Sequence, residues 1–376
     1  MLRNSRNKFN EQDGFSDFKD FRIFAFRKKT KIMMKNTIFI LFTIIISLLS
    51  LTNCKNSEEK KENETAIDKK LSHNYLSKKI KQISDEIKKH PNKAINYFNR
   101  AKLYETDNKL MLAIKDMEKA VSINKENFKY YNYQAKLYFD ATNIKAAIKS
   151  YKKSISINSK DDYAFIRLGE IYLYQAKPQE CVENLNSALR RNKYNPETYA
   201  LKSSYYLQMK DTARAISNLR TSIDVDPDYF NSYLDLGYLY SLKNNADGIV
   251  YYTNALNLQP SNTKVLYNRA LLYQNIDSFN KAITDYKKIL EINSIHKSAN
   301  YNLGYIFFLK EKYEMGIKYF TKSISAAPQY YEAYFGRAIC YDSLNNKEKA
   351  RKDYQKILSN KPDDKIVKQA LSKLNN

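Results

Sequence analysis

The side chains that most often carry out chemistry are scarce in this chain. Its 376 residues include three cysteines and three histidines. His73, His90 and His296 lack the spacing of metal ligands, and three cysteines are too few for a disulfide framework. We find no Gly-x-Ser-x-Gly, Gly-x-x-x-x-Gly-Lys or His-Glu-x-x-His sequence. The sequence therefore predicts a protein that is not an enzyme, with no catalytic residues, metal site, cofactor or small-molecule substrate.

Cys54 is the cysteine whose context suggests a chemical role. It follows Leu51 and closes the uncharged apolar run 37–51, which comes after several lysines. Fifteen helical residues span about 22 Å, short of the ~30 Å hydrocarbon core of a bilayer. This length is typical of the apolar part of a signal peptide; the alternative is a short uncleaved signal anchor. Residues 33–54 resemble a bacterial lipoprotein signal.

The lipoprotein resemblance implies cleavage before Cys54 and lipidation of its thiol. We therefore expect the protein in the bacterial cell envelope, lipid-anchored to a membrane on its periplasmic or surface-facing side. Residues 1–32 contain four acidic side chains, which the start of a signal peptide should lack. We interpret 1–32 as an over-extended N-terminus, with translation from Met33 or Met34 rather than Met1, and 33–53 as the signal peptide. The polar segment 54–70 is expected to be a flexible tether.

The net charge is +24, from 64 Lys and Arg against 40 Asp and Glu. Three interpretations stay open: lysines spread over solvated faces, a surface that attracts acidic partners or anionic lipid headgroups, and nucleic-acid binding. No run of five basic residues and no nucleic-acid-binding motif is present, so nucleic acid is not an expected partner.

An aromatic residue returns every 34 residues, and this period predicts the elements that must position any site. With only 7 Gly and 7 Pro, the chain is expected to be helical almost throughout. One step of the period, from the fifth to the sixth aromatic, is 33 residues. The recurring aromatics are Tyr104, Tyr138, Tyr172, Tyr206, Tyr240, Tyr273, Phe307 and Tyr341.

Small residues accompany each aromatic, three positions before it and eight or nine after it, as with Ala101 and Ala113 around Tyr104. Four positions beyond the second small residue stands a large apolar one, such as Met117. The pattern predicts two amphipathic helices that touch at their small residues. One such hairpin cannot bury its apolar face alone, so neighbouring hairpins must stack.

This spacing is similar to that of the tetratricopeptide repeat family. The resemblance implies an all-α fold, an α-solenoid of about eight tandem helix hairpins that forms a right-handed superhelix. We assign the eight repeats to 94–364, the last seven starting at residues 128, 162, 196, 230, 263, 297 and 331. Capping helices are expected in 71–93 and 365–376.

The resemblance also implies a function, a protein–protein interaction scaffold or adaptor that binds a partner protein or peptide. In that family first helices line a concave groove, and the matching positions are rich in Tyr and Leu. The alternatives are a structural assembly factor for an envelope complex, a basic surface for anionic polymers, and, for single groove residues, packing between repeats. The predicted groove residues are Tyr163, Ile166, Tyr174, Leu234, Tyr238, Tyr267, Leu271, Tyr301, Tyr305, Phe308 and Phe335.

Overall fold

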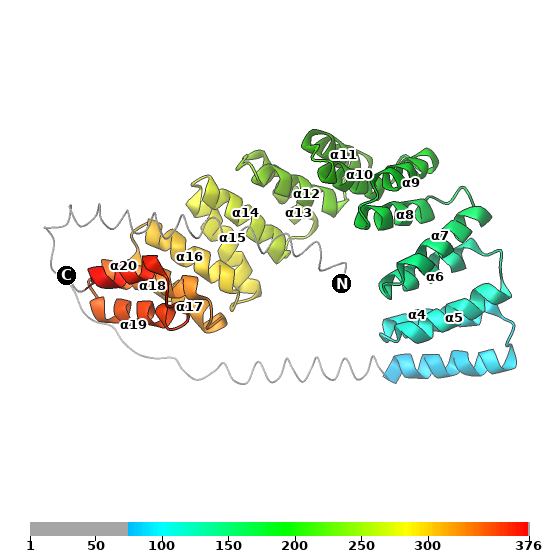
Figure 1. Cartoon of the computed structure of the whole chain (residues 1–376), viewed down its shortest axis with the longest axis horizontal. Coiled ribbons are helices and arrows are strands. Elements are labelled where there is room, and N and C mark those ends of the chain that lie inside the picture. Colours follow the sequence, from blue (N-terminus) through cyan, green and yellow to red (C-terminus); the bar gives the residue numbers. More distant parts are fainter. Residues whose placement is uncertain (1–73, 375–376) are drawn as a thin grey trace. The chain divides into compact units, whose positions relative to one another are not determined.

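The computed structural model describes residues 74–374, and every regular element in that range is an α-helix. A helix over residues 74–89 comes first and is followed by helix hairpins in succession (Figure 1). These helices are α4 (Ala94–Thr106), α5 (Leu110–Ile123), α6 (Phe128–Asp140), α7 (Ile144–Ile157), α8 (Asp162–Tyr174), α9 (Pro178–Arg191), α10 (Pro196–Gln208), α11 (Thr212–Val225), α12 (Phe230–Ser241), α13 (Asp247–Leu258), α14 (Thr263–Asn275), α15 (Phe279–Ile292), α16 (Lys297–Leu309), α17 (Tyr313–Ala326), α18 (Tyr331–Ser343), α19 (Lys347–Leu358) and α20 (Lys365–Lys373).

The described residues divide into two compact units, 74–232 and 233–374. Inside each unit the two helices of a hairpin pack together, and the second helix also contacts the first helix of the next hairpin, as α5 contacts α6 and α17 contacts α18. First helices of successive hairpins touch as well, α8 with α10 and α16 with α18. The stacked helix hairpins predicted from the 34-residue period are thereby confirmed.

Each hairpin turns through a residue in the left-handed backbone region. At the second turn Thr142 has φ 59°, its N–H donates to the carbonyl of Phe139, and the N–H of Asn143 donates to the carbonyl of Tyr138 at 2.8 Å. This pair of bonds is a Schellman motif, which satisfies the last carbonyls of the first helix. Tyr138, whose carbonyl accepts the bond from Asn143, is one of the recurring aromatic residues. The left-handed residues are Asn108, Thr142, Ala176, Lys210, Asn244, Asp277, Glu311 and Asn345.

Polar side chains cap four of the first helices and the closing helix α20. The side chains of Asn127, Asn195, Asn262 and Asp364 each accept a hydrogen bond from a backbone N–H in the first turn that follows. Such a cap satisfies a donor that has no partner inside the helix. His296 does the same for α16, with Nδ1 accepting from the N–H of Ala299 at 3.1 Å.

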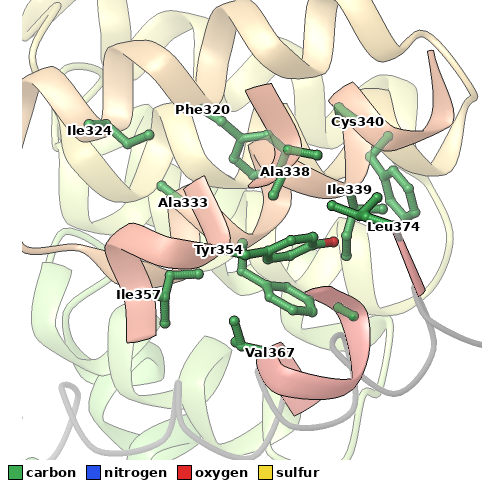
Figure 2. Packing of buried hydrophobic residues seen from close by; sticks show 14 residues of the cluster. Phe320, Ile324, Ala333, Ala338, Ile339, Cys340, Tyr354, Ile357, Val367 and Leu374 are labelled. Atoms are coloured by element: carbon green, nitrogen blue, oxygen red, sulfur yellow. The ribbon is translucent and has the colours of Figure 1, made fainter. Parts of the chain in front are cut away.

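Small and large residues interlock where the helices cross. A Cβ atom on Gly304 would lie 2.8 Å from Cδ1 of Phe320, and one on Gly336 would lie 2.6 Å from its Cε1. Glycine at both places therefore lets α16 and α18 close around one ring of α17. Figure 2 shows the cluster, which continues to Tyr354 and Val367.

The recurring large apolar residues of the second helices are buried in all eight repeats, as their spacing predicts. The fifth repeat lacks one residue, and its second helix α13 is 12 residues long, against 14 for α11 and α15. Gly248 still takes the small place there, because a Cβ would come within 3.0 Å of the carbonyl oxygen of Gly237. The buried large residues are Met117, Tyr151, Leu185, Leu219, Tyr252, Tyr286, Phe320 and Tyr354.

Three ion pairs, shielded from solvent, join first helices to second helices. Arg269 donates from Nε and Nη2 to the two carboxylate oxygens of Asp285, both at 2.8 Å, and from Nη1 to the Thr253 hydroxyl at 2.9 Å. The same fork repeats twice. Its other members are Arg100 with Asp116 and Ser84, and Arg337 with Asp353 and Thr321.

Among residues 74–374 no helix is long and apolar enough to cross a membrane. The predicted signal peptide, Cys54 and the tether lie outside this range, and the boundaries assigned to them stay predictions.

Candidate functional site

The first helices of the unit 74–232 carry charges that already have partners. Glu105 on α4 accepts from the Tyr133 hydroxyl and pairs with Lys136, both on α6, and Lys136 also lies 3.3 Å from Asp140. Burial acts to raise the pKa of Glu105, but the hydrogen bonds from Lys136 and Tyr133 outweigh it and hold that pKa below its usual value. This network joins the first two hairpins. Its charged groups are paired with one another and are therefore not available to bind a ligand.

The next hairpin presents a similar group. Arg167 on α8 pairs with Glu170 at 2.6 Å and with Glu197 on α10, and its guanidinium lies over the Tyr163 ring. Tyr174 lies at the end of the same helix and is 60% exposed.

Tyrosine rings gather in the unit 233–374 on the first helices and the segments that precede them. The Tyr301 ring on α16 lies 5.6 Å from the buried Phe320 and 5.2 Å from Tyr330, which precedes α18. The Tyr267 ring on α14 lies 6.0 Å from the ring of His296. We call Tyr267, Tyr301, Tyr305 and Tyr330 the tyrosine face.

Hydrogen bonds and burial fix the state of these rings. Asn302 donates from Nδ2 to the hydroxyls of Tyr267 and Tyr286, at 3.2 and 3.0 Å. Burial raises the pKa of Tyr301 well above its ordinary value, and Tyr330 and Glu332 act in the same direction. Tyr301 therefore keeps a neutral hydroxyl, which can both donate and accept hydrogen bonds.

The sequence matches family models described as tetratricopeptide repeat in six stretches that together cover more than half of the chain. The matched residues are 94–127, 128–161, 196–229, 263–296, 298–330 and 331–364. The chain belongs to the tetratricopeptide repeat family. The unmatched stretches 162–195 and 230–262 fold into hairpins of the same kind, α8 with α9 and α12 with α13.

Similar proteins are known by sequence and by structure. The DnaJ homolog subfamily C member 7 homolog of Dictyostelium discoideum is 25% identical over 205 residues, which are 50% of this chain and 38% of that protein. PilW, titled a widely conserved type IV pilus biogenesis factor, is 17% identical, with 56% of this chain and 98% of PilW covered at a TM-score of 0.45. YrrB, titled a tetratricopeptide repeat protein with an unusual peptide-binding site, is 18% identical, with 49% and 95% covered at 0.38. These two likenesses concern the fold alone.

Most of the predicted groove residues lie at least partly open to solvent. Tyr163 and Tyr174 are exposed. Whether a partner contacts any of them stays a prediction. The partly buried ones are Leu234, Tyr238, Tyr267, Leu271, Tyr301 and Tyr305.

Three of the predicted groove residues are not accessible, and the prediction is wrong for them. Ile166 and Phe335 are 1% exposed and Phe308 is 3% exposed. Phe335 packs its ring 5.8 Å from that of Tyr354, and Phe308 lies 6.2 Å from Tyr313. These side chains fill the space inside and between repeats instead of facing a partner.

Sequence reasoning missed Tyr330 and Asn302. Tyr330 is the last residue of its repeat, and the aromatic residues that follow it indicate a region rich in rings. Sequence reasoning also missed the three Arg–Asp pairs. The sequence pattern that could have revealed them is an arginine followed 16 residues later by an aspartate, in the first, sixth and eighth tetratricopeptide repeats.

Residues 74–374 hold no group of His, Cys, Asp and Glu side chains that could bind a metal ion. Cys181 and Cys340 are buried free thiols, and burial raises the pKa of Cys181 to about 11. Both thiols are therefore protonated near neutral pH and poor nucleophiles.

Proposed function

We propose that this protein is a lipid-anchored adaptor of the bacterial cell envelope. In this proposal the tyrosine face holds an extended segment of a partner protein. Tetratricopeptide repeat proteins are in general protein-interaction scaffolds, and this general role applies to the chain as a member of the family. The membrane anchor, the location and the binding residues belong to the proposal.

The observation that carries the proposal is the gathering of Tyr267, Tyr301 and Tyr330 around His296 and Phe320. Tyrosine offers a large apolar contact area with few rotatable bonds, so little conformational entropy is lost when a partner binds. Its neutral hydroxyl can bond to the backbone of an extended segment. Such a face suits a segment with apolar or aromatic side chains better than a strongly charged one.

The anchor rests on the sequence Leu51-Thr52-Asn53-Cys54 at the end of the apolar run 37–51. A single acyl chain holds a protein to a bilayer only marginally, whereas several chains hold it stably. Cys54→Ser should therefore release the protein from membranes or leave an unprocessed precursor. Mass spectrometry of protein extracted from native membranes measures whether Cys54 is lipidated. An unmodified Cys54 thiol would refute the anchor.

Photocrosslinking in the native cell tests the tyrosine face. A photoreactive amino acid placed at position 305 should capture a partner protein, while the same group at the exposed Tyr194, in a loop between repeats, should not. Tyr267→Ala together with Tyr305→Ala should weaken capture of that partner by roughly thirtyfold or more, since losing a central interface aromatic can cost about 2 kcal/mol.

The pattern of captured proteins separates an adaptor from an assembly factor. Many partners in small amounts indicate an adaptor, and one partner in constant ratio indicates an assembly factor. Equal capture at positions 305 and 194 would show that the tyrosine face is not the binding site.

A further inference from the structure

Four lysines occupy equivalent places on the second helices of the first two repeats. Lys115 and Lys119 lie on α5, and Lys149 and Lys153 on α7. Residues four apart lie on one face of a helix, and α5 and α7 both pack against α6. All four side chains are exposed, and none has an ion-pair partner within residues 74–374. We call these four residues the lysine row.

The surroundings of the row add to its positive charge. Helix α7 contains two further exposed lysines, Lys145 and Lys152, and no acidic residue. On α5 the carboxylate of Asp116 is buried against Arg100, which neutralises it. Glu118 is the exposed acidic side chain on α5, and it accepts a hydrogen bond from Tyr138 at 2.8 Å.

The row ends sharply inside the same unit. On α9 the two equivalent places hold Glu183 and Ser187, and on α11 they hold Ser217 and Thr221. Within the unit 74–232 the row is therefore confined to the first two repeats, which follow the N-terminal segment directly.

We propose that the lysine row binds the anionic headgroup surface of a lipid bilayer. The choice of a bilayer rests on the proposed lipid anchor at Cys54. Only residues 55–73 separate that cysteine from the first described helix. A tether of the kind predicted for this polar segment would span about 25 Å on average, which would keep the first two repeats near the surface that holds the anchor. Each lysine near an anionic surface strengthens binding by about fivefold.

The unit 233–374 carries lysines at the same two places, on α17 and α19, and they differ from the row in two ways. Lys352 pairs with Glu348 at 2.8 Å, and both helices begin with a glutamate, Glu314 and Glu348. These lysines are also far along the chain from the anchor. We therefore assign the bilayer contact to the lysine row.

Vesicle flotation tests the proposal on the full chain carrying Cys54→Ser, so that no acyl chain contributes. Phosphatidylcholine vesicles with phosphatidylglycerol should bind this protein more tightly than vesicles without it, and high salt should remove the difference. Neutral vesicles measure what the apolar run 37–51 contributes. Replacing the whole row by glutamine (K115Q, K119Q, K149Q and K153Q) should weaken binding to the anionic vesicles at least tenfold.

Two further variants make the test specific. Replacing four other exposed lysines of the same unit by glutamine (K102Q, K160Q, K177Q and K193Q) removes the same charge and should change binding less than threefold. Replacing the row by arginine keeps the charge and should retain binding. Circular dichroism checks that each variant is folded.

Several results would overturn the proposal. Equal losses in the two glutamine variants would show that total charge, and not the row, attracts the vesicles. No preference for anionic vesicles would reject the bilayer as the partner, and tighter row-dependent binding to an RNA oligonucleotide would replace it with nucleic acid. Lipidation of Cys54 is measured separately by mass, so the anchor can fail while the row still binds vesicles, and the reverse.

Discussion

His296 caps a helix with a group that titrates near neutral pH. Its Nδ1 can accept the hydrogen bond from Ala299 only while that nitrogen is unprotonated. Burial lowers the pKa of His296, and the neighbouring Lys297 acts in the same direction. The folded protein thus favours the neutral form, while the unfolded chain takes up a proton near pH 6.5. The contribution of His296 to stability is present above that pH and is lost as the pH falls.

We predict that His296→Asn removes this pH dependence. Asparagine caps the equivalent helices at Asn127, Asn195 and Asn262, and it does not titrate in this range. The melting temperatures of the wild type should fall more steeply than those of the variant between pH 7 and pH 5 (values near the ordinary histidine pKa). Parallel curves would show that the pKa of His296 is the same in the folded and the unfolded chain.

The pair of Arg269 with Asp285 makes a second prediction at the scale of single residues. Asp285→Ala leaves the guanidinium inside the repeat without its carboxylate and should cost about 3 kcal/mol of unfolding free energy. Replacing both residues by apolar ones of similar volume, Arg269→Met with Asp285→Leu, should restore much of that loss. Urea denaturation measures both.

The exposed pair of Lys352 with Glu348 is the control for this experiment. Glu348→Ala should have little effect on stability, because solvent screens that pair. If Asp285→Ala has as little effect, the shielded ion pairs do not hold the helices together.

At the scale of the elements, the hairpin turns hold residues other than glycine at a positive φ, and a substitution could relieve this backbone strain. Thr142 is β-branched and has φ 59°, a conformation that glycine adopts without steric cost. Thr142→Gly should therefore raise the free energy of unfolding by about 1 kcal/mol. Asn108→Gly at the equivalent turn should gain less, since asparagine tolerates this region. Thermal denaturation compares them, and a destabilised Thr142→Gly variant would contradict the argument.

The helices and turns were predictable because small, aromatic and large apolar side chains recur at fixed positions every 34 residues. The small residues, the recurring aromatics and the large residue such as Phe320 all fell where the hairpin geometry requires them. The candidate face was less predictable. Phe335 occupies the same place in its repeat as Tyr301, yet it is buried, because accessibility depends on neighbouring side chains that the period does not specify.

At the scale of the whole molecule, each hairpin depends on its neighbours, so damage should stay local. Gly336→Ala would bring a Cβ within 2.6 Å of Cε1 of Phe320 and should cost about 1–3 kcal/mol by overpacking. Hydrogen exchange should then show lost amide protection in α16 to α20 and unchanged protection in α4 to α9. The exposed Gln329→Ala is the control. Uniform loss of protection would mean that the array unfolds as a single cooperative block.

The shielded arginine forks have a consequence for how the gene could change. Arg337 bonds to the Thr321 hydroxyl of the hairpin before it, as Arg269 bonds to Thr253. Recombination between two similar segments could excise residues 297–330 in frame and leave the helical period intact. Lys287 would then take the place of Thr321. The positive charges of Lys287 and Arg337 would lie together at a fork whose single carboxylate, that of Asp353, pairs with one cation. Although the repeats look alike, the sixth and the eighth are each matched to the repeat before them, so selection should act against deletions that separate these pairs.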